Sequence, residues 1–363
     1  MAKYGIEGFE DDELDYYSRQ IVLQDIGLTG QRKLKEARVC LVGLGGLGSP
    51  IAIQLASMGV GHLRIVDRDV VETSNLQRQH LYDMDMVGYP KVEAAAMRLS
   101  KQNPYIEIEA LPTSLTSFNA EKIVAGMDVV VDGLDRMAPR YALNRACVKH
   151  GIPFVFGAAI THVGNTSTII PGETACLECF LGDIDDEEMP TCSTVGVHPA
   201  IINIIASIQV TEVVRILTGK TPNLKDTLIY CDLSDLSFEK VHIAKVDGCP
   251  VCGSDAISEP PTSTHELLEE ICGRDGRRVF VFTPREDLNL NLDLLNEHLV
   301  SLGFDINVGA KLGTTFSREP DIKASVLKSG VTILEGVDSR DEAVKLHSLL
   351  AVEKTGRDTG KQG

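Results

Sequence analysis

The stretch LVGLGGLGSP, residues 41–50, constrains the fold of this chain more than any other. Gly43, Gly45 and Gly48 form the spacing G-x-G-x-x-G directly after an apolar segment. This spacing is typical of a tight turn between a strand and a helix, whose N-terminal amides bind phosphate. Asp67 follows Gly48 by 19 residues, where an acid binds ribose hydroxyls in dinucleotide folds. The pattern predicts a nucleotide site, but by itself it also fits a nicotinamide dehydrogenase or a turn without a ligand.

The segments after this turn alternate between buried strands and helices. That order predicts an α/β, Rossmann-like fold with a mostly parallel sheet and helices on both faces. The apolar stretch 199–217 carries polar residues and is interpreted as a buried core helix instead of a membrane span. We expect strands at 38–43, 62–69, 106–112, 127–135 and 153–160, and helices at 13–36, 50–58, 91–102, 119–126 and 138–150.

Composition also predicts a division into domains. The segment 255–264 (DAISEPPTST) is rich in Pro, Ser and Thr and is interpreted as a linker. It separates a large domain, 1–254, from a small α+β domain, 265–352, and 353–363 is expected to be a disordered tail. The small domain shows no catalytic constellation, so we expect it to bind or recruit a partner. Its expected strands are 278–283, 304–311, 322–328 and 331–335, and its expected helices are 290–302 and 339–350.

The charge balance limits the classes of partner. The chain has 35 Lys and Arg against 52 Asp and Glu, a net charge of −17. A nucleic acid or an anionic membrane would require a basic face, so neither is expected. The acidic start MAKYGIEGFEDDELD has no apolar stretch of a signal peptide, and nine cysteines are an odd number for a disulfide framework. Reduced thiols and a cytoplasmic location are the expectation.

Polar residues after the second and fourth strands favour a triphosphate. The segment NLQRQ, residues 75–79, places Asn75, Arg78 and Gln79 close together, and Lys91 begins a helix after Pro90. A triphosphate requires such cations, whereas a dinucleotide pyrophosphate is usually held by the helix N-terminus. The alternative for Arg78 and Lys91 is a solvated face. Strand-end Asp132 and Asp135 are candidate oxygen ligands for Mg²⁺.

Taken together, GLGGLG, the D-x-D at 67–69, NLQRQ at 75–79, PKVE at 90–93 and Asp135 resemble one family. It is the ubiquitin-activating-enzyme-like adenylyltransferase family of the MoeB, ThiF and HesA type, and the resemblance spans about residues 14–253. Its members activate molybdopterin-synthase, thiamine-pathway and ubiquitin-like carrier proteins. The resemblance implies that Mg²⁺ and ATP convert the C-terminal Gly-Gly carboxylate of a ubiquitin-like protein to an acyl-adenylate, releasing pyrophosphate.

The resemblance also assigns residues. It implies that Asp67 binds the ribose, that Asp135 binds Mg²⁺, and that Arg19 reaches the active site of a second protomer in a homodimer. Further nucleotide-binding positions are Gly43, Gly45, Gly46, Gly48, Asp69, Asn75, Arg78, Gln79 and Lys91, of which Arg78 and Lys91 are also catalytic candidates together with Arg19.

Two pairs of cysteines have the spacing of a zinc site. Cys176 and Cys179 form one C-x-x-C, and Cys249 and Cys252 form the other, followed by glycine. Four thiolates suit a closed tetrahedral Zn²⁺ site, and the resemblance supports the pairing. The alternatives are unrelated buried thiols or a redox pair.

Cys192 lies in the segment PTCST, which resembles the nucleophile segment of ubiquitin-activating enzymes. The resemblance implies a thioester on Cys192 and transfer to a conjugating enzyme. The alternatives are sulfur-carrier activation for molybdopterin, thiamine or tRNA thiolation, an exposed thiol without a role, and, in other classes, an NAD-dependent oxidoreductase or a non-catalytic scaffold.

Overall fold

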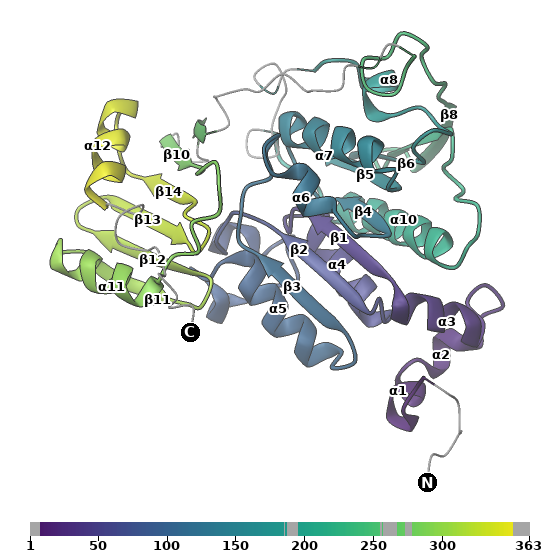
Figure 1. The fold of residues 1–363 in the computed structure, drawn as a ribbon, viewed down its shortest axis with the longest axis horizontal. Helices are drawn as coiled ribbons and strands as arrows, with labels where there is room; N and C mark the ends of the chain where they lie inside the picture. The colour runs from purple at the N-terminus through teal and green to yellow at the C-terminus, as the bar shows by residue number, and fades with distance from the viewer. Residues whose placement is uncertain are drawn as a thin grey trace, which may run out of the picture. The chain divides into compact units, whose positions relative to one another are not determined.

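The protein folds around two β-sheets (Figure 1). The computed structural model describes residues 8–184, 186, 195–254, 256, 267–272 and 278–350. Within these residues one sheet has eight strands and the other has six.

The larger sheet has the strand order β3-β2-β1-β4-β5-β6-β7-β8. Strand β4 is parallel to both β1 and β5. All five strands expected in this part of the chain are present, because runs such as VCLV are apolar on both faces and are buried there. Their bounds are β1 (Arg38–Val42), β2 (His62–Val66), β3 (Glu107–Leu111), β4 (Val129–Asp132) and β5 (Phe154–Ile160).

The other side of this sheet is antiparallel. Strands β6 (Val163–Ile169), β7 (Thr227–Asp232) and β8 (Ser237–His242) extend it beyond β5, each antiparallel to the strand before it. These three strands were not expected from the sequence. The α/β prediction is therefore confirmed, but the sheet is parallel only on the side that carries the glycine-rich turn.

Helices connect the parallel strands as expected. Their bounds are α4 (Gly48–Ser57), α5 (Lys91–Gln102), α6 (Ala120–Val124) and α7 (Met137–His150), with 3₁₀ helices η1 (Thr73–Asn75) and η2 (Met84–Met86). With right-handed crossovers, a sheet that grows in both directions from β1 carries helices on both faces. The single helix expected over 13–36 is instead three short ones: α1 (Asp11–Tyr16), α2 (Ser18–Ile21) and α3 (Gly27–Glu36). The backbone leaves the helical conformation at Tyr17, where ψ is 7°, and again at Gly27, where φ is 59°.

Helix α10 (Pro199–Leu217) is long and apolar enough to cross a membrane by length and composition. Here it packs along β4, β5 and β6 and against α4. Its polar residues are engaged inside the fold: Gln209 donates to the Asp132 carbonyl (2.9 Å), and Glu212 accepts from Thr168 and Leu224 (2.9 and 2.7 Å). These contacts make α10 a core helix, as predicted.

The second sheet is antiparallel between its paired strands and has the order β11-β12-β13-β14-β10-β9. Two of its strands, β9 and β12, were not expected from the sequence. Its elements are β9 (Leu268–Cys272), β10 (Arg278–Phe282), α11 (Leu292–Ser301), β11 (Asp305–Gly309), β12 (Gly313–Arg318), β13 (Ile322–Leu327), β14 (Thr332–Glu335) and α12 (Arg340–Leu350).

The chain forms two compact units, and the second includes more than this sheet. It contains Val66–Ala95 and Ala110–Ala120 as well as the described residues from 267 to 350. The first unit contains the described residues up to Ile65, Ala96–Glu109 and those from Glu121 to 256. The predicted domain boundaries at 254 and 265 therefore differ from this division and stay a prediction about the linker.

Candidate functional site

The glycine-rich turn joins β1 to α4 in the first compact unit. Gly43 has a φ of 89°, and a Cβ built on it would lie 2.6 Å from the carbonyl of Gly133. A Cβ on Gly48 would lie 1.8 Å from the Gly43 oxygen. Only glycine fits at both positions. The backbone amides at the start of α4 are therefore not covered by side chains of these two residues, as phosphate binding requires. Gly45 accepts a hydrogen bond from the Ser49 amide (3.0 Å), and Gly46 lies near Ile202.

Gly133 is a member of this close approach that the sequence analysis missed. It follows β4, and a Cβ there would lie 2.4 Å from the Gly43 oxygen. The sequence signal was the glycine in VDGLD, near the end of the strand predicted over 127–135.

Asp132, at the end of β4, has a structural partner. It is fully buried, and its Oδ2 accepts a hydrogen bond from Arg140 Nε at 2.6 Å, while its Oδ1 accepts from the Leu134 amide at 2.9 Å. Burial raises the pKa of Asp132, and the Arg140 guanidinium opposes that rise. The expectation that Asp132 shares a Mg²⁺ ion is wrong, because its carboxylate is taken by this buried pair. Asp135, by contrast, is exposed and stays the candidate ligand.

The second compact unit holds the acids after β2. The Asp69 amide donates to Asp67 Oδ1 at 2.7 Å, so the two residues form one turn. Lys91 Nζ lies 2.8 Å from Asp69 Oδ2, and the Lys91 amide donates to the Asp69 carbonyl at 2.9 Å. Desolvation opposes ionisation of Asp69, but the charges of Lys91 and Arg68 outweigh it and lower the pKa of Asp69. The carboxylate is therefore ionised at neutral pH and holds the ammonium in place.

Three residues of the NLQRQ segment, Asn75, Arg78 and Gln79, are buried in and after η1. Asn75, Arg78, Gln79 and Lys91 are 7%, 8%, 3% and 4% exposed. A solvated face is therefore the wrong interpretation of Arg78 and Lys91. Arg78 Nη1 donates to the Ser74 carbonyl at 3.0 Å, and the Glu72 amide donates to Asn75 Oδ1 at 3.3 Å. Gln79 Oε1 is buried and has no hydrogen-bond partner within the described residues. A polar ligand or a bound water would supply the missing hydrogen bond.

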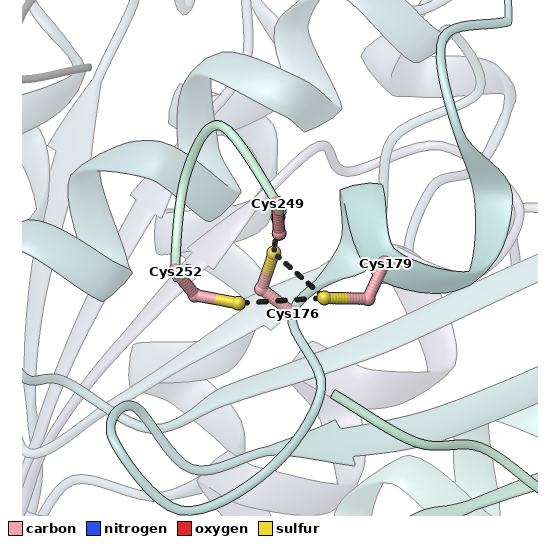
Figure 2. Close-up of side chains that lie close together, drawn as sticks. All are labelled: Cys176, Cys179, Cys249 and Cys252. Atoms are coloured by element: carbon pink, nitrogen blue, oxygen red, sulfur yellow. Dashed lines mark hydrogen bonds between the residues drawn. The ribbon is translucent and has the colours of Figure 1, made fainter. Parts of the chain in front are cut away.

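The four cysteines of the predicted zinc site come together (Figure 2). Their sulfur atoms all lie within 4.8 Å of one another and point toward a common centre. Three of the distances are 3.9 Å (Cys176 to Cys179), 3.6 Å (Cys176 to Cys249) and 3.4 Å (Cys179 to Cys252). A tetrahedral zinc with Zn–S bonds of about 2.3 Å separates its sulfurs by about 3.8 Å, so the set fits that ion. Burial raises the pKa of the Cys176 thiol, a cost that a divalent cation offsets.

Two catalytic candidates are not tested by this geometry. Arg19 is exposed on α2, as an arginine that reaches a second protomer would be. Cys192 lies outside the described residues. Its neighbour in sequence, His198, caps α10 by accepting a hydrogen bond from the Ala200 amide at Nδ1. The roles of both residues stay predictions.

The acidic segment before Cys192 contributes a helix cap. Asp186 accepts from the amides of Met137 (2.6 Å) and Ala138 (2.9 Å) at the start of α7. A carboxylate at a helix N-terminus is favourable because the unpaired amides carry partial positive charge. This cap was not expected from the sequence.

Comparisons with known proteins agree with the sequence motifs. The ThiF family model matches residues 17–251. The chain is 39% identical over 246 residues to the SAMP-activating enzyme E1 of Haloferax volcanii, covering 68% of this chain and 91% of that one. It is 33% identical over 340 residues to the sulfur carrier protein ThiS adenylyltransferase of Bacillus subtilis, covering 91% and 97%.

Solved structures show the same fold. The crystal structure of Escherichia coli MccB with AMPCPP and MccA matches with a TM-score of 0.59 at 22% identity, over 67% of this chain and 75% of that one. Because the family model covers more than half of the residues and the relatives extend over two thirds or more, the chain belongs to the ThiF family.

Proposed function

We propose that this protein uses ATP and Mg²⁺ to adenylate the C-terminal carboxylate of a sulfur-carrier protein. The observation that carries the proposal is the similarity to a sulfur-carrier adenylyltransferase along 91% of the chain, including the residues after the linker. The buried cations Arg78 and Lys91 support it, because their charge matches a triphosphate.

The reaction requires alignment more than proton transfer. The carrier's terminal carboxylate is ionised near neutral pH, so its oxygen attacks the α-phosphorus directly. A carboxylate–phosphorus bond forms, the bond to the bridging oxygen breaks, and pyrophosphate leaves. Arg78 and Lys91 neutralise the charge that develops on the phosphate oxygens. Asp135 would hold a Mg²⁺ ion, which would supply further positive charge there.

A four-cysteine zinc site is proposed as structural. All four of its ligands come from the protein, so it has no open position for a substrate. It joins the α8 (Leu177–Leu181) segment to the turn after β8.

Transfer through Cys192 is the second candidate. A relative named SAMP-activating enzyme E1 favours it, together with the resemblance of the PTCST segment to the nucleophile segment of ubiquitin-activating enzymes. In this version the Cys192 thiolate would attack the acyl-adenylate, AMP would leave, and a thioester would form.

Pyrophosphate–ATP exchange tests the adenylation step. Purified protein is mixed with Mg²⁺, ATP, labelled pyrophosphate and each candidate carrier that ends in Gly-Gly. We expect exchange that depends on one carrier and is lost in Asp135→Ala. Lys91→Met should slow exchange by about 10²- to 10³-fold, as loss of one charge-stabilising group does. The matched control is Lys101→Met, an exposed lysine at the other end of α5, which should match the wild type.

A second experiment measures whether the acyl group is transferred to Cys192. A carrier–enzyme adduct that thiol reagents cleave and that is lost in Cys192→Ala would establish thioester transfer. Normal exchange in Cys192→Ala without such an adduct would favour sulfur-carrier activation. Binding of NADH with no exchange for any carrier would contradict the adenylation proposal.

A further inference from the structure

The six-stranded sheet buries both of its faces. On one face Phe316 and Ala324 belong to the core formed with α11 and α12. Because neighbouring residues of a strand point to opposite faces, Thr315 and Ser325 lie on the other face, where their hydroxyls are 2.9 Å apart and buried. Polar atoms buried on this second face need partners from elsewhere in the unit, and Val66–Ala95 and Ala110–Ala120 supply them.

Near its β11 edge, the second face of the sheet contacts the segment just before Lys91. Thr315 Oγ1, on β12, donates to the Gly88 carbonyl at 2.7 Å. A Cβ on Gly88 would lie 2.8 Å from Val308 Cγ2, and a Cβ on Gly313 would lie 2.8 Å from Pro90 Cγ. The β11–β12 hairpin therefore lies so close to residues 88–90 that neither Gly88 nor Gly313 has room for a side chain.

Glu93 continues this contact into α5. Its carboxylate is 8% exposed and accepts from the amides of Lys311 (3.0 Å) and Leu312 (2.7 Å) in the loop between β11 and β12. Hydrogen bonds to a buried carboxylate are among the stronger ones in proteins. They hold the first turn of α5 two residues after Lys91.

The opposite edge of the sheet contacts the acids that face Lys91. Glu269, on β9, forms a two-point ion pair with Arg68, at 2.7 and 3.2 Å. Arg68 lies between Asp67 and Asp69 in the chain, and Asp69 holds the Lys91 ammonium. Strands β9 and β11 are the two edges of the sheet, so the polar segment is anchored at both of them.

We infer that the six-stranded sheet is part of the adenylation machinery: Thr315 and Glu93 at one edge and Glu269 at the other position Lys91 and the Asp67–Asp69 turn for the nucleotide. Thr315, Glu93 and Glu269 are positioning residues, since they act through other residues. This inference rests on the proposed function. Its physical basis is that a cation stabilises a transferring phosphoryl group well only when it lies within a fraction of an ångström of its productive position.

Two neighbouring threonines make a matched test. Thr315 and Thr314 are both buried on β12, but Thr314 Oγ1 donates to Asn296 on α11, on the opposite face (2.8 Å). We expect Thr315→Val to weaken binding of a non-hydrolysable Mg–ATP analogue, and to raise KM for ATP in exchange, by about 3- to 10-fold, the equivalent of one hydrogen bond. Thr314→Val should change the melting temperature by about as much as Thr315→Val does. It should leave analogue binding and the KM for ATP within about twofold of the wild type. Thr315→Ser keeps the hydroxyl and should restore them.

A second variant tests the other edge without disturbing the core. Glu269→Gln removes the charge that pairs with Arg68 on a side chain that is 18% exposed. It should weaken analogue binding in the same direction with little change in melting temperature. Equal nucleotide constants for Thr315→Val and Thr314→Val, with Glu269→Gln like the wild type, would overturn the inference.

Analogue binding separates this inference from the proposed function. A wild-type protein that binds the analogue but exchanges pyrophosphate with no carrier would remove the proposed reaction, and the threonine comparison would still decide the positioning role. A wild-type protein that binds no analogue would overturn both.

Discussion

Several charged side chains of this protein are buried, and each is held by specific partners. Asp132 and Arg140 pair inside the first unit, and Glu93 and Lys91 are buried in the second. A buried charge is tolerated only with partners, so each of these side chains is held in one geometry. The sequence identified Lys91 by its place after Pro90, but its burial depends on residues far away in the chain, which no local pattern records.

Asp132→Asn should destabilise the protein by about 3–5 kcal/mol, because it leaves the Arg140 guanidinium buried without its charge partner. Asp128→Asn is the control at the other end of β4, where an exposed carboxylate accepts from the Arg38 amide at 2.8 Å. It should cost about 1 kcal/mol or less. Urea unfolding measures both, and equal costs would contradict a buried ion pair.

Glu109 predicts a pH dependence. Its burial opposes ionisation, but hydrogen bonds from Arg64 (2.8 Å) and His62 (2.9 Å) outweigh it and hold the pKa of Glu109 below its ordinary value of 4.5. The folded state therefore binds the proton less well than the unfolded state. Its stabilisation is present above pH 4.5 and is lost as the pH falls through the folded pKa.

We expect Glu109→Gln to cost about 1 kcal/mol at pH 7. The difference from the wild type should shrink as the pH falls below about 4.5. Glu107→Gln, two residues earlier on β3 with a side chain that is 74% exposed, is the control and should show little change across this range. If the wild type stayed more stable than Glu109→Gln by the same free energy from pH 7 to pH 3, the lowered pKa of Glu109 would be contradicted.

Elements with a strong local pattern were predictable, and those without one were not. The strands β1, β2 and β4 are apolar runs, and the glycine-rich turn marks where β1 ends. Strand β8, with the sequence SFEKVH, is exposed along most of its length, so hydrophobic periodicity does not reveal it. The cysteine cluster was predictable in part: the spacing within each C-x-x-C indicated a pair of ligands, and the family resemblance supported the pairing of the two motifs.

The turn that carries Cys249 and Cys252 depends on Gly253. A Cβ there would lie 2.3 Å from the Asp247 carbonyl and 2.6 Å from that of Cys249. Gly253→Ala should therefore open the turn and lower the bound zinc, measured by elemental analysis, well below one equivalent. Gly248→Ala is the matched control, because a Cβ at Gly248 meets nothing within 4 Å. Full zinc in both variants would show that the turn is not what holds the ligands together.

At the scale of the whole chain, composition predicted a linker between two domains, but it did not predict which residues pack together in each compact unit. The Pro-rich segment 255–264 separates the two sheets in sequence. The compact units cross it, because Val66–Ala95 belongs with the residues after the linker. Buried polar contacts such as Glu93 with Lys311 join residues 218 positions apart, and a single sequence holds no signal for such a pairing.

Removing the residues after 264 should therefore damage more than the small domain. Truncation leaves Glu93 without its amide partners and exposes Gly88 and Pro90. We expect the truncated chain to melt at a temperature at least several degrees lower, as a loss of a few kcal/mol does, or to aggregate. Deletion of 353–363 alone, predicted as a disordered tail, should leave the melting temperature unchanged. A truncated chain as stable as the full one would show that the two predicted domains fold independently.

The division of the chain into these units also sets the order in which it can fold during synthesis. Residues 66–95 leave the ribosome early, but the last strand and helix that complete their unit end at Leu350. At about 5–20 residues per second, the 255 positions between 95 and 350 take roughly 13–50 s to make. Throughout that interval this segment lacks the sheet that contacts it at Gly88, Pro90 and Glu93. A chaperone, or the growing chain itself, has to keep this surface from aggregating until translation is nearly finished.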